Sequence, residues 1–150
     1  LPQNLLDAYK KQFIHFESTT SLLSQLTMAK FMEEGEWVRH IKRMRVVYKR
    51  KMQCLVLELK KQFKQNISII GEQSGLYLLV KLHLDCSEKW LIEQAAFYGV
   101  KVYPTSIYFI KNQSDRTMIK LGFSNLSCDE IQLGVKLLKK AWSRNMPDNH

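Results

Sequence analysis

The sequence lacks both a long apolar run and a secretory leader. No stretch of about 18 apolar residues without charge occurs among the 150 residues, so we expect no membrane-spanning helix. The first residues do not show the basic-then-apolar order of a signal peptide. We therefore expect a soluble, cytoplasmic protein with no membrane partner.

Cysteine is scarce, with only Cys54, Cys86 and Cys128 along the chain. The three are far apart and include no Cys-x-x-Cys pair, and neither they nor the histidines have metal-ligand spacing. They are expected to be reduced thiols in a cytosolic protein. His83, Asp85 and Cys86 come nearest to a cluster, but a helix-capping Asp beside a chance neighbour explains them. We therefore predict no metal site.

Catalytic signatures are also missing. The chain has no glycine-rich phosphate loop, no Gly-x-Ser-x-Gly elbow, no His-Glu-x-x-His and no close pair of acids on one helical face. Its 14 Asp and Glu are scattered among predicted caps and solvent-facing positions. Motif evidence therefore favours a binding or assembly module over a self-sufficient enzyme.

The first half of the sequence is helical in pattern. Apolar residues at helical spacing predict helices over residues 3–16 and from about 21 to Gly35, followed by a long helix over 37–64. The long helix should bury one continuous stripe. That stripe consists of Trp37, Ile41, Met44, Tyr48, Met52, Leu55, Leu59 and Phe63.

The opposite face of the long helix is basic and supplies much of the net charge of +9. It carries Arg39, Lys42, Arg43, Lys49, Arg50, Lys60, Lys61 and Lys64. Such a face suits nucleic acid, but long helices ordinarily present Lys and Arg to solvent. The chain also has no glycine-aromatic RNA-binding signature and no helix-turn-helix spacing. A basic nucleic-acid-binding module is therefore one alternative, and the less favoured one.

The second half changes to a strand pattern. Residues 67–71 and 76–84 should pair as antiparallel neighbours, followed by a helix from Ser87 to Gly99. The segments "VKVYP", "SIYFI" and "TMIKLGF" predict two or three further strands, with Pro104 limiting the pairing of the first. Ser127 and Glu130 then form a capping box that begins a final helix.

This order of elements predicts an α+β fold with one core. A small, mostly antiparallel sheet should carry helices on one face, preceded by the long helix. In the strand "TMIKLGF", alternation sends Ile119, Leu121 and Phe123 to the core and Lys120 to the other face. Lys120 is either a solvent-facing lysine or a cation that meets an anionic small molecule.

Several stretches together resemble the MocR/GabR-type transcriptional regulators of the GntR superfamily, in the C-terminal part of their aminotransferase-like domain. The most specific stretches are "GEWVRHIKRMRVVYKRK" and "LGFSNLSCDEIQLGV". The looser ones are "SGLYLLVKL" and "AAFYGVKVYPTSIYF". The resemblance extends from the start of the chain to about Trp142.

The resemblance implies the C-terminal small domain of the fold type I aminotransferase fold. Residues 1–35 would be helices leading from a large domain, 36–143 the small domain and 144–150 a polar tail. The absence of an initiator methionine before "LPQNLLDAYKKQF" agrees with a fragment. The full-length parent would bind pyridoxal phosphate (PLP), whereas this chain would bind none covalently, since no lysine has the family's flanking residues. DNA would be bound only by a missing N-terminal domain.

The resemblance also implies site residues. Lys120 stands where aminotransferases, and some of these regulators, carry an arginine that binds the substrate carboxylate. Lysine keeps the charge but lacks the planar fork that pairs with two oxygens. Lys120 is thus a candidate for binding the carboxylate of an amino-acid-like effector.

Two segments are candidates for loops near this site. Ser18, Thr19 and Thr20 resemble the segment that approaches the neighbouring subunit's site in a type I homodimer, although a role as helix caps alone is the favoured interpretation. The stretch "YPTS", from Tyr103 to Ser106, resembles the loop at the site's mouth, with a plain turn as the alternative.

Three functions remain open at the level of sequence. The favoured one is the C-terminal part of the effector-sensing and oligomerisation domain of a PLP-dependent regulator, which is not an enzyme as this fragment. The second is the small domain of a true PLP-dependent aminotransferase, which shares the fold. The third is the basic nucleic-acid-binding module.

Overall fold

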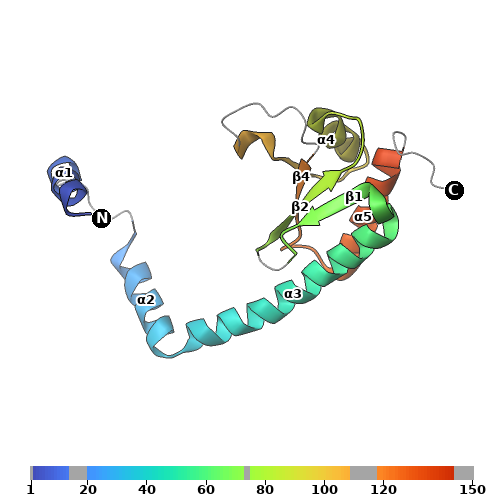
Figure 1. Cartoon of the computed structure of the whole chain (residues 1–150). Coiled ribbons are helices and arrows are strands. Elements are labelled where there is room, and N and C mark those ends of the chain that lie inside the picture. Colours follow the sequence, from blue (N-terminus) through green and yellow to red (C-terminus); the bar gives the residue numbers. More distant parts are fainter. Residues whose placement is uncertain (1, 14–19, 73–74, 109–117, 144–150) are drawn as a thin grey trace. The chain divides into compact units, whose positions relative to one another are not determined.

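The computed structural model describes residues 2–13, 20–72, 75–108 and 118–143. The chain divides into two compact units, Leu1–Arg43 and Met44–His150, and each is considered by itself. Figure 1 shows the elements coloured in chain order.

The first unit is helical, as its pattern predicts. Helix α1 spans Gln3–Phe13 and α2 spans Leu22–Glu33. The side chain of Ser21 caps α2 by accepting a hydrogen bond from the backbone N–H of Ser24 at 3.2 Å. Gly35 has a φ of 72°, a left-handed conformation that glycine adopts without strain, and it separates α2 from the next helix. The predicted stop at Gly35 is confirmed.

The long helix is α3, Glu36–Phe63, but its predicted buried stripe is only half right. Its buried apolar side chains begin at Met52, whereas Trp37 is 37% exposed and Tyr48 is half-buried. Apolar spacing decides which side of a helix is apolar, but burial needs a neighbouring element. In the second unit, the sheet and a later helix pack against only about the last three turns of α3.

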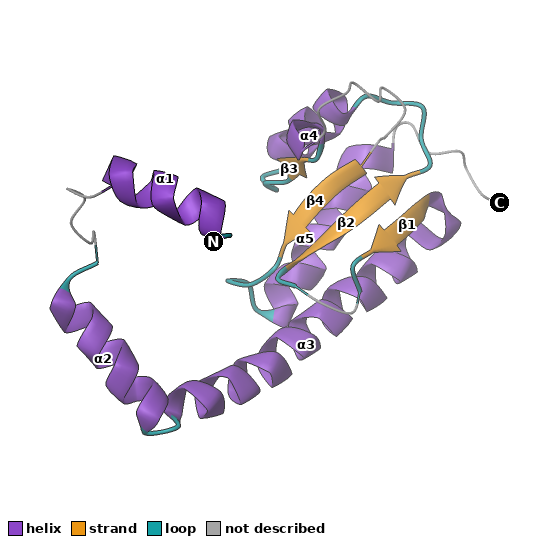
Figure 2. Ribbon diagram, turned by 60° about the vertical axis from the view of Figure 1, so that its left-hand side comes forward, coloured by secondary structure: helices purple, strands orange, loops and turns teal. Residues whose placement is uncertain are grey.

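The second unit is built on a four-stranded antiparallel sheet in the order β1-β2-β4-β3. Strand β1 is Ile67–Ile70, β2 is Tyr77–Leu82, β3 is Tyr103–Pro104 and β4 is Met118–Gly122. The predicted pairing of β1 with β2 is confirmed, with Ile67 opposite Leu82. Figure 2 shows α5 and the C-terminal half of α3 behind these strands.

One predicted strand is wrong. The segment "SIYFI" does not begin as a strand, because Ser106–Tyr108 form a short 3₁₀ helix, η2. Its last two residues lie outside the described part of the chain. β-branched and aromatic residues favour a strand only where a neighbouring strand is there to pair, and here Ile107 is 70% exposed.

Two capped helices complete the unit. Helix α4, Glu88–Phe97, begins at the side-chain cap of Ser87. Helix α5, Cys128–Trp142, begins at the predicted capping box, in which the Ser127 N–H donates to Glu130 Oε2 at 2.7 Å. These hydrogen bonds lower the pKa of Glu130. The predicted apolar face of α5 is confirmed, since Ile131, Val135, Leu138 and Trp142 are all buried.

The core lies between one face of the sheet and the helices. The indole of Trp142 is fully buried, packs on Phe63 with ring centroids 5.7 Å apart, and donates from Nε1 to the Leu91 carbonyl at 3.0 Å. It therefore ties α5 to both α3 and α4. The expected α+β architecture, a small antiparallel sheet with helices on one face, is confirmed.

Candidate functional site

Lys120 lies inside the sheet, on the face opposite the core. It is paired with Leu79 of β2 on one side and with Tyr103 of β3 on the other. Its neighbours Ile119 and Leu121 are buried in the core, while Lys120 itself is half-buried. The orientation predicted from strand alternation is therefore confirmed.

Three tyrosine rings surround the ammonium group of Lys120. The Nζ atom lies 5.5 Å from the ring centroid of Tyr77, 5.4 Å from that of Tyr103 and 4.9 Å from that of Tyr108. For Tyr77 and Tyr103 these are distances at which a cation is attracted by the negative face of an aromatic ring, whereas the ammonium lies beyond the hydroxyl end of Tyr108. We call Tyr77, Tyr103 and Tyr108 the tyrosine cluster. Each ring is at least 40% exposed, so the cluster is open to solvent.

The Lys120 ammonium is also hydrogen-bonded, donating from Nζ to Tyr108 Oη at 2.6 Å. None of the four ion pairs among the described residues includes Lys120. A half-buried cation that forms no ion pair with a described carboxylate suits an incoming anion, because the anion would be attracted without first displacing a protein carboxylate.

The loop that presents Tyr108 is fastened to α4 through Glu88. The carboxylate accepts hydrogen bonds from the backbone N–H of Thr105 at 2.6 Å and of Ser106 at 3.1 Å. It also accepts from the Ser106 hydroxyl at 2.5 Å, and the Thr105 hydroxyl, whose single hydrogen is shared with the Met118 carbonyl, lies 3.1 Å away. Partial burial would raise the pKa of Glu88, but these hydrogen bonds outweigh burial and lower it.

Thr105 fastens the same loop to the sheet. Its side chain is buried, and its Oγ1 donates to the carbonyl of Met118 on β4 at 3.0 Å. Met118 stands two residues before Lys120 in that strand. The loop and the lysine are thus held by the same strand.

The structure brings together some of the predicted site residues and not others. Tyr103 lies beside Lys120, as the resemblance implies, whereas Ser106 turns its hydroxyl to Glu88 and helps to anchor the loop. Thr20 belongs to the first unit and is exposed, and the neighbouring cap is Ser21. Ser18 and Thr19 lie outside the described residues. Ligand binding by any of these residues stays a prediction.

Tyr77 and Tyr108 were not predicted from the sequence as site residues. Tyr77 pairs with Gly122, and strand alternation puts it on the same face as Lys120, so knowledge of the register would have identified it. Tyr108 belongs to η2 and stands 12 residues before Lys120, with no regular strand spacing between them. Only the tertiary structure brings its hydroxyl to the lysine.

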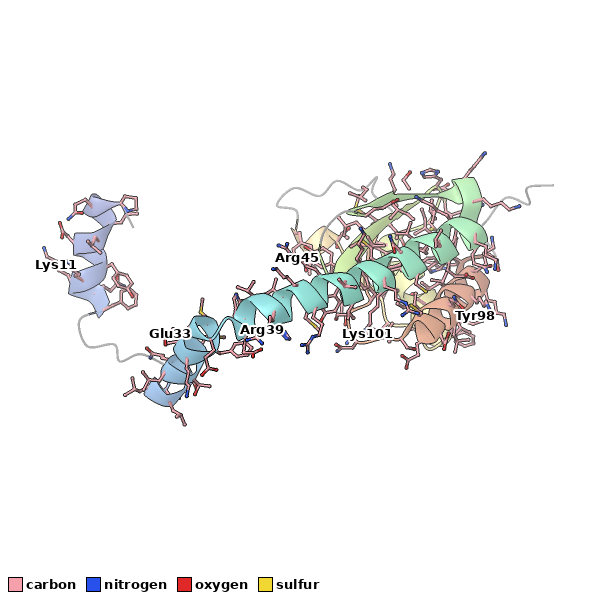
Figure 3. The ribbon with its side chains drawn as sticks, turned by 90° about the horizontal axis from the view of Figure 1, so that it is seen from below. Lys11, Glu33, Arg39, Arg45, Tyr98 and Lys101 are labelled. Atoms are coloured by element: carbon pink, nitrogen blue, oxygen red, sulfur yellow. The ribbon has the colours of Figure 1, made fainter. Side chains whose placement is uncertain are left out.

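The basic face of α3 behaves as a solvated surface. All eight lysines and arginines predicted there are exposed. Arg39, labelled in Figure 3, donates to Glu36 within an ion pair of 2.8 Å, and Lys60 pairs with Glu72 at 3.0 Å. Exposed pairs of this kind contribute little stability and leave the positive charge accessible.

Other kinds of site find little support in the part of the chain that the structure describes. There, no group of three or more His, Cys, Asp or Glu is arranged to hold a metal ion. No described helix is long and apolar enough to cross a bilayer. The Cys54 thiol donates to the Cys128 carbonyl at 3.5 Å, and burial raises the pKa of Cys54, which makes it a poor nucleophile.

Similar sequences occur in transcriptional regulators. The uncharacterised HTH-type transcriptional regulator YdeL of Bacillus subtilis is 38% identical over 142 residues, covering 95% of this chain and 30% of YdeL. The probable rhizopine catabolism regulatory protein MocR of Rhizobium meliloti is 24% identical, over 95% of this chain and 29% of MocR. The chain thus spans less than a third of the length of these relatives. No protein-family model matches it.

Enzymes share the fold. Aromatic-amino-acid aminotransferase 1 of Thermococcus litoralis is 23% identical over 85% of this chain and 30% of the enzyme. The α-aminoadipate aminotransferase LysN of Thermus thermophilus superimposes with a TM-score of 0.77 at 22% identity, over 95% of this chain and 35% of LysN. The aromatic aminotransferase Aro9 of Candida albicans superimposes with a TM-score of 0.80 at 19% identity, over 95% of this chain and 34% of Aro9. The predicted resemblance, regulator relatives combined with an aminotransferase fold, is confirmed.

Proposed function

Because the chain fits the C-terminal aminotransferase-like domain of the MocR/GabR-type transcriptional regulators, we propose that it senses an effector and supports oligomerisation in such a regulator. The parent would be a cytoplasmic, PLP-dependent homodimer of the GntR superfamily that binds DNA through an N-terminal domain outside this chain. As a separate chain it is not an enzyme.

Lys120 carries this proposal. It is a half-buried cation on the sheet face opposite the core, held by Tyr108 and bordered by the tyrosine cluster. In the proposed function its ammonium binds the acid group of an amino-acid-like effector, and the aromatic rings exclude water from one side of the contact. The opposite charges of the two groups and the partial exclusion of water both strengthen the hydrogen bond between them.

The N-termini of the two capped helices in the second unit do not fit the cofactor's phosphate by themselves. Phosphates favour helix N-termini, where free backbone N–H groups and the helix dipole meet. Here the N-terminus of α4 is capped by Ser87 and carries Glu88, and that of α5 is capped by Ser127 and carries Asp129 and Glu130. Acidic groups there repel a phosphate. In the proposed function, other parts of the parent hold the cofactor.

A true aminotransferase is the first alternative, since the Thermococcus litoralis enzyme is a relative and the fold is shared. A winged-helix region upstream in the parent would identify a regulator, and its absence would favour the enzyme. The nucleic-acid-binding module is the second alternative, supported by the exposed basic face of α3. Steep salt dependence of DNA binding by this chain alone would favour it.

The proposal is tested by a visible absorption spectrum of this chain mixed with PLP, before and after an amine is added. The parent protein is measured beside it. We expect a specific, amine-responsive band in the parent and none in this chain. A stoichiometric, amine-responsive band from this chain alone would contradict the proposal, because a lysine present here would then be the reactive one.

The role of Lys120 is tested in the parent by Lys120→Ala. The side chain lies outside the core, so the variant should fold and dimerise as the wild type does. Its effector response, measured as effector-dependent DNA binding, should weaken by about tenfold or more, as for loss of a charge-assisted hydrogen bond. An unchanged response would identify Lys120 as an ordinary surface lysine.

A further inference from the structure

A lysine is an incomplete carboxylate receptor. A carboxylate has two oxygens, and the planar guanidinium of arginine pairs with both through two parallel N–H donors. The lysine ammonium is a single point charge without that fork. At Lys120 one of its three N–H bonds is already directed at Tyr108 Oη, 2.6 Å away.

Tyr108 can supply the missing donor. A phenol has one O–H donor and can accept at the same oxygen. The ammonium has no lone pair, so in this contact Tyr108 Oη is the acceptor and its own hydrogen points elsewhere. The two groups therefore stand side by side as donors, with the phenol made a better donor by the adjacent positive charge.

The pair is held in place before any ligand arrives. Tyr108 donates its backbone N–H to the Thr105 carbonyl at 3.0 Å, and buried Thr105 donates to the Met118 carbonyl of β4. Lys120 belongs to the same strand. Through Glu88 the loop is also fastened to α4. Donors fixed in this way lose little freedom on binding.

The other two tyrosines of the cluster lie beside Lys120 and add apolar surface next to the two donors. Tyr77 and Tyr103 approach the ammonium from β2 and β3, at 5.5 and 5.4 Å from their ring centroids. Their rings are about half exposed and present apolar surface beside the charge. A small carboxylate with an apolar or aromatic body would contact both the rings and the donors.

We propose that Lys120 and Tyr108 together form a composite fork that binds the two oxygens of one carboxylate, Lys120 through N–H and Tyr108 through O–H. The inference rests on the proposed function for the class of ligand, and it adds Tyr108 as a binding residue. The pair performs the task that a single arginine performs with one side chain.

The test uses this chain and benzoate as the probe, with benzamide as its neutral counterpart. Binding is followed by chemical-shift changes of the backbone amides near Lys120 and Tyr108, at constant ionic strength. We expect saturable binding of benzoate that is about tenfold or more tighter than that of benzamide, because only benzoate carries the charge. Equal shifts from both compounds, or none from benzoate, would overturn the proposal.

Single substitutions separate the two donors. Lys120→Met keeps an unbranched side chain of similar length without the charge and should reduce benzoate binding to the level of benzamide. Tyr108→Phe keeps the ring and should weaken benzoate binding about three- to tenfold, as for the loss of one hydrogen bond. The matched control is Tyr103→Phe, which removes a hydroxyl from a ring at a similar distance and should leave the affinity within about twofold.

The decisive variant replaces the lysine by arginine. Lys120→Arg supplies both donors from one side chain, so in this background Tyr108→Phe should change benzoate affinity by less than about twofold. Tyr108 is 61% exposed, so the substitutions should leave the thermal unfolding midpoint unchanged, which excludes a folding artefact. An equal loss from Tyr108→Phe in the lysine and arginine backgrounds would overturn the composite fork.

Failure of this inference differs from failure of the proposed function. Benzoate binding that depends on both donors, together with an unchanged effector response of the parent Lys120→Ala variant, would keep the fork and reject the sensing role. Loss of response in the parent, together with benzoate binding that ignores Tyr108, would keep the sensing role and reject the fork.

Discussion

The two compact units of the chain carry similar apolar patterns but use them differently. In the second unit the pattern is buried, with Leu59, Leu91 and Trp142 fully enclosed between helices and sheet. In the first unit none of the described residues is buried, and Leu22 and Leu23 of α2 are 69% and 76% exposed. Helical spacing of apolar residues therefore indicates a helix in both units, but a core only where another layer of structure covers it.

Helix α3 shows the same difference within one element. Its spacing is regular from Trp37 to Phe63, yet its buried residues begin only at Met52. The stabilisation of the chain should therefore be concentrated in the second unit, and two predictions test this by matched changes in the two units, while a third concerns an anchor within the second unit.

The largest effect is expected from emptying the core. Trp142→Ala should lower the free energy of unfolding by about 3–5 kcal/mol, since it leaves a cavity and removes the hydrogen bond to Leu91. Leu23→Ala, its counterpart in the first unit, should change it by no more than about 0.5 kcal/mol. Urea unfolding followed by far-UV circular dichroism measures both. A loss above about 2 kcal/mol from Leu23→Ala would show that α2 is packed in solution.

A smaller effect is expected from removing helix caps. Ser127→Ala breaks the capping box of α5 and should cost about 1 kcal/mol of unfolding free energy, because α5 is part of the core. Ser21→Ala breaks the equivalent cap of α2 and should leave the unfolding of the second unit unchanged. Tryptophan fluorescence in urea, measured in a Trp37→Phe background so that only Trp90 and Trp142 contribute, reports on that unit. Equal losses from both variants would mean that the two units unfold together.

The smallest effect concerns the Glu88 anchor and depends on pH. Hydrogen bonds hold the pKa of Glu88 below the ordinary value of 4.5, so the ionised group stabilises the folded state above that value. This contribution should be lost as the pH falls through the lowered pKa. Solvent screens a partly exposed carboxylate, so Glu88→Gln should cost at most about 1 kcal/mol at pH 7.

Thermal unfolding of the Glu88→Gln variant beside the wild type, from pH 7 to pH 3, measures that dependence. The difference in thermal unfolding midpoint between the two proteins should become smaller as the pH falls towards 3. Glu93→Gln on the exposed side of α4 is the control and should show no such closing gap, because Glu93 makes only a long ion pair with Lys89, at 3.8 Å. A difference in unfolding midpoint that does not shrink at all between pH 7 and pH 3 would contradict the anchor.

Much of the second unit could be predicted from the sequence, because local rules agree there with the tertiary structure. The Ser-x-x-Glu spacing predicted the start of α5, two β-rich runs predicted the pairing of β1 with β2, and period-two alternation predicted the outward direction of Lys120. The "SIYFI" segment was predicted wrongly. Its composition suits a strand, but Thr105 and Ser106 are bound by Glu88, and the chain turns into η2 instead.

The cation of the candidate site could be predicted from the sequence, but most of the side chains around it could not. Lys120 was identified from the resemblance and from alternation, and Tyr103 from the same resemblance. Tyr77 and Tyr108 were not, because their approach to Lys120 depends on strand register and on the path of a loop. These are long-range properties that no local pattern specifies.

The sequence by itself determined which segments are helical, where the caps and the glycine stop lie, and which side of β4 carries a charge. Caps, turns and alternation act over a few residues, so their effects can be predicted locally. Only the tertiary structure decided which apolar faces are buried and which side chains gather around Lys120. Burial requires a partner surface, and the contact between Lys120 and Tyr108 joins residues 12 apart in the chain through the anchors at Thr105 and Glu88.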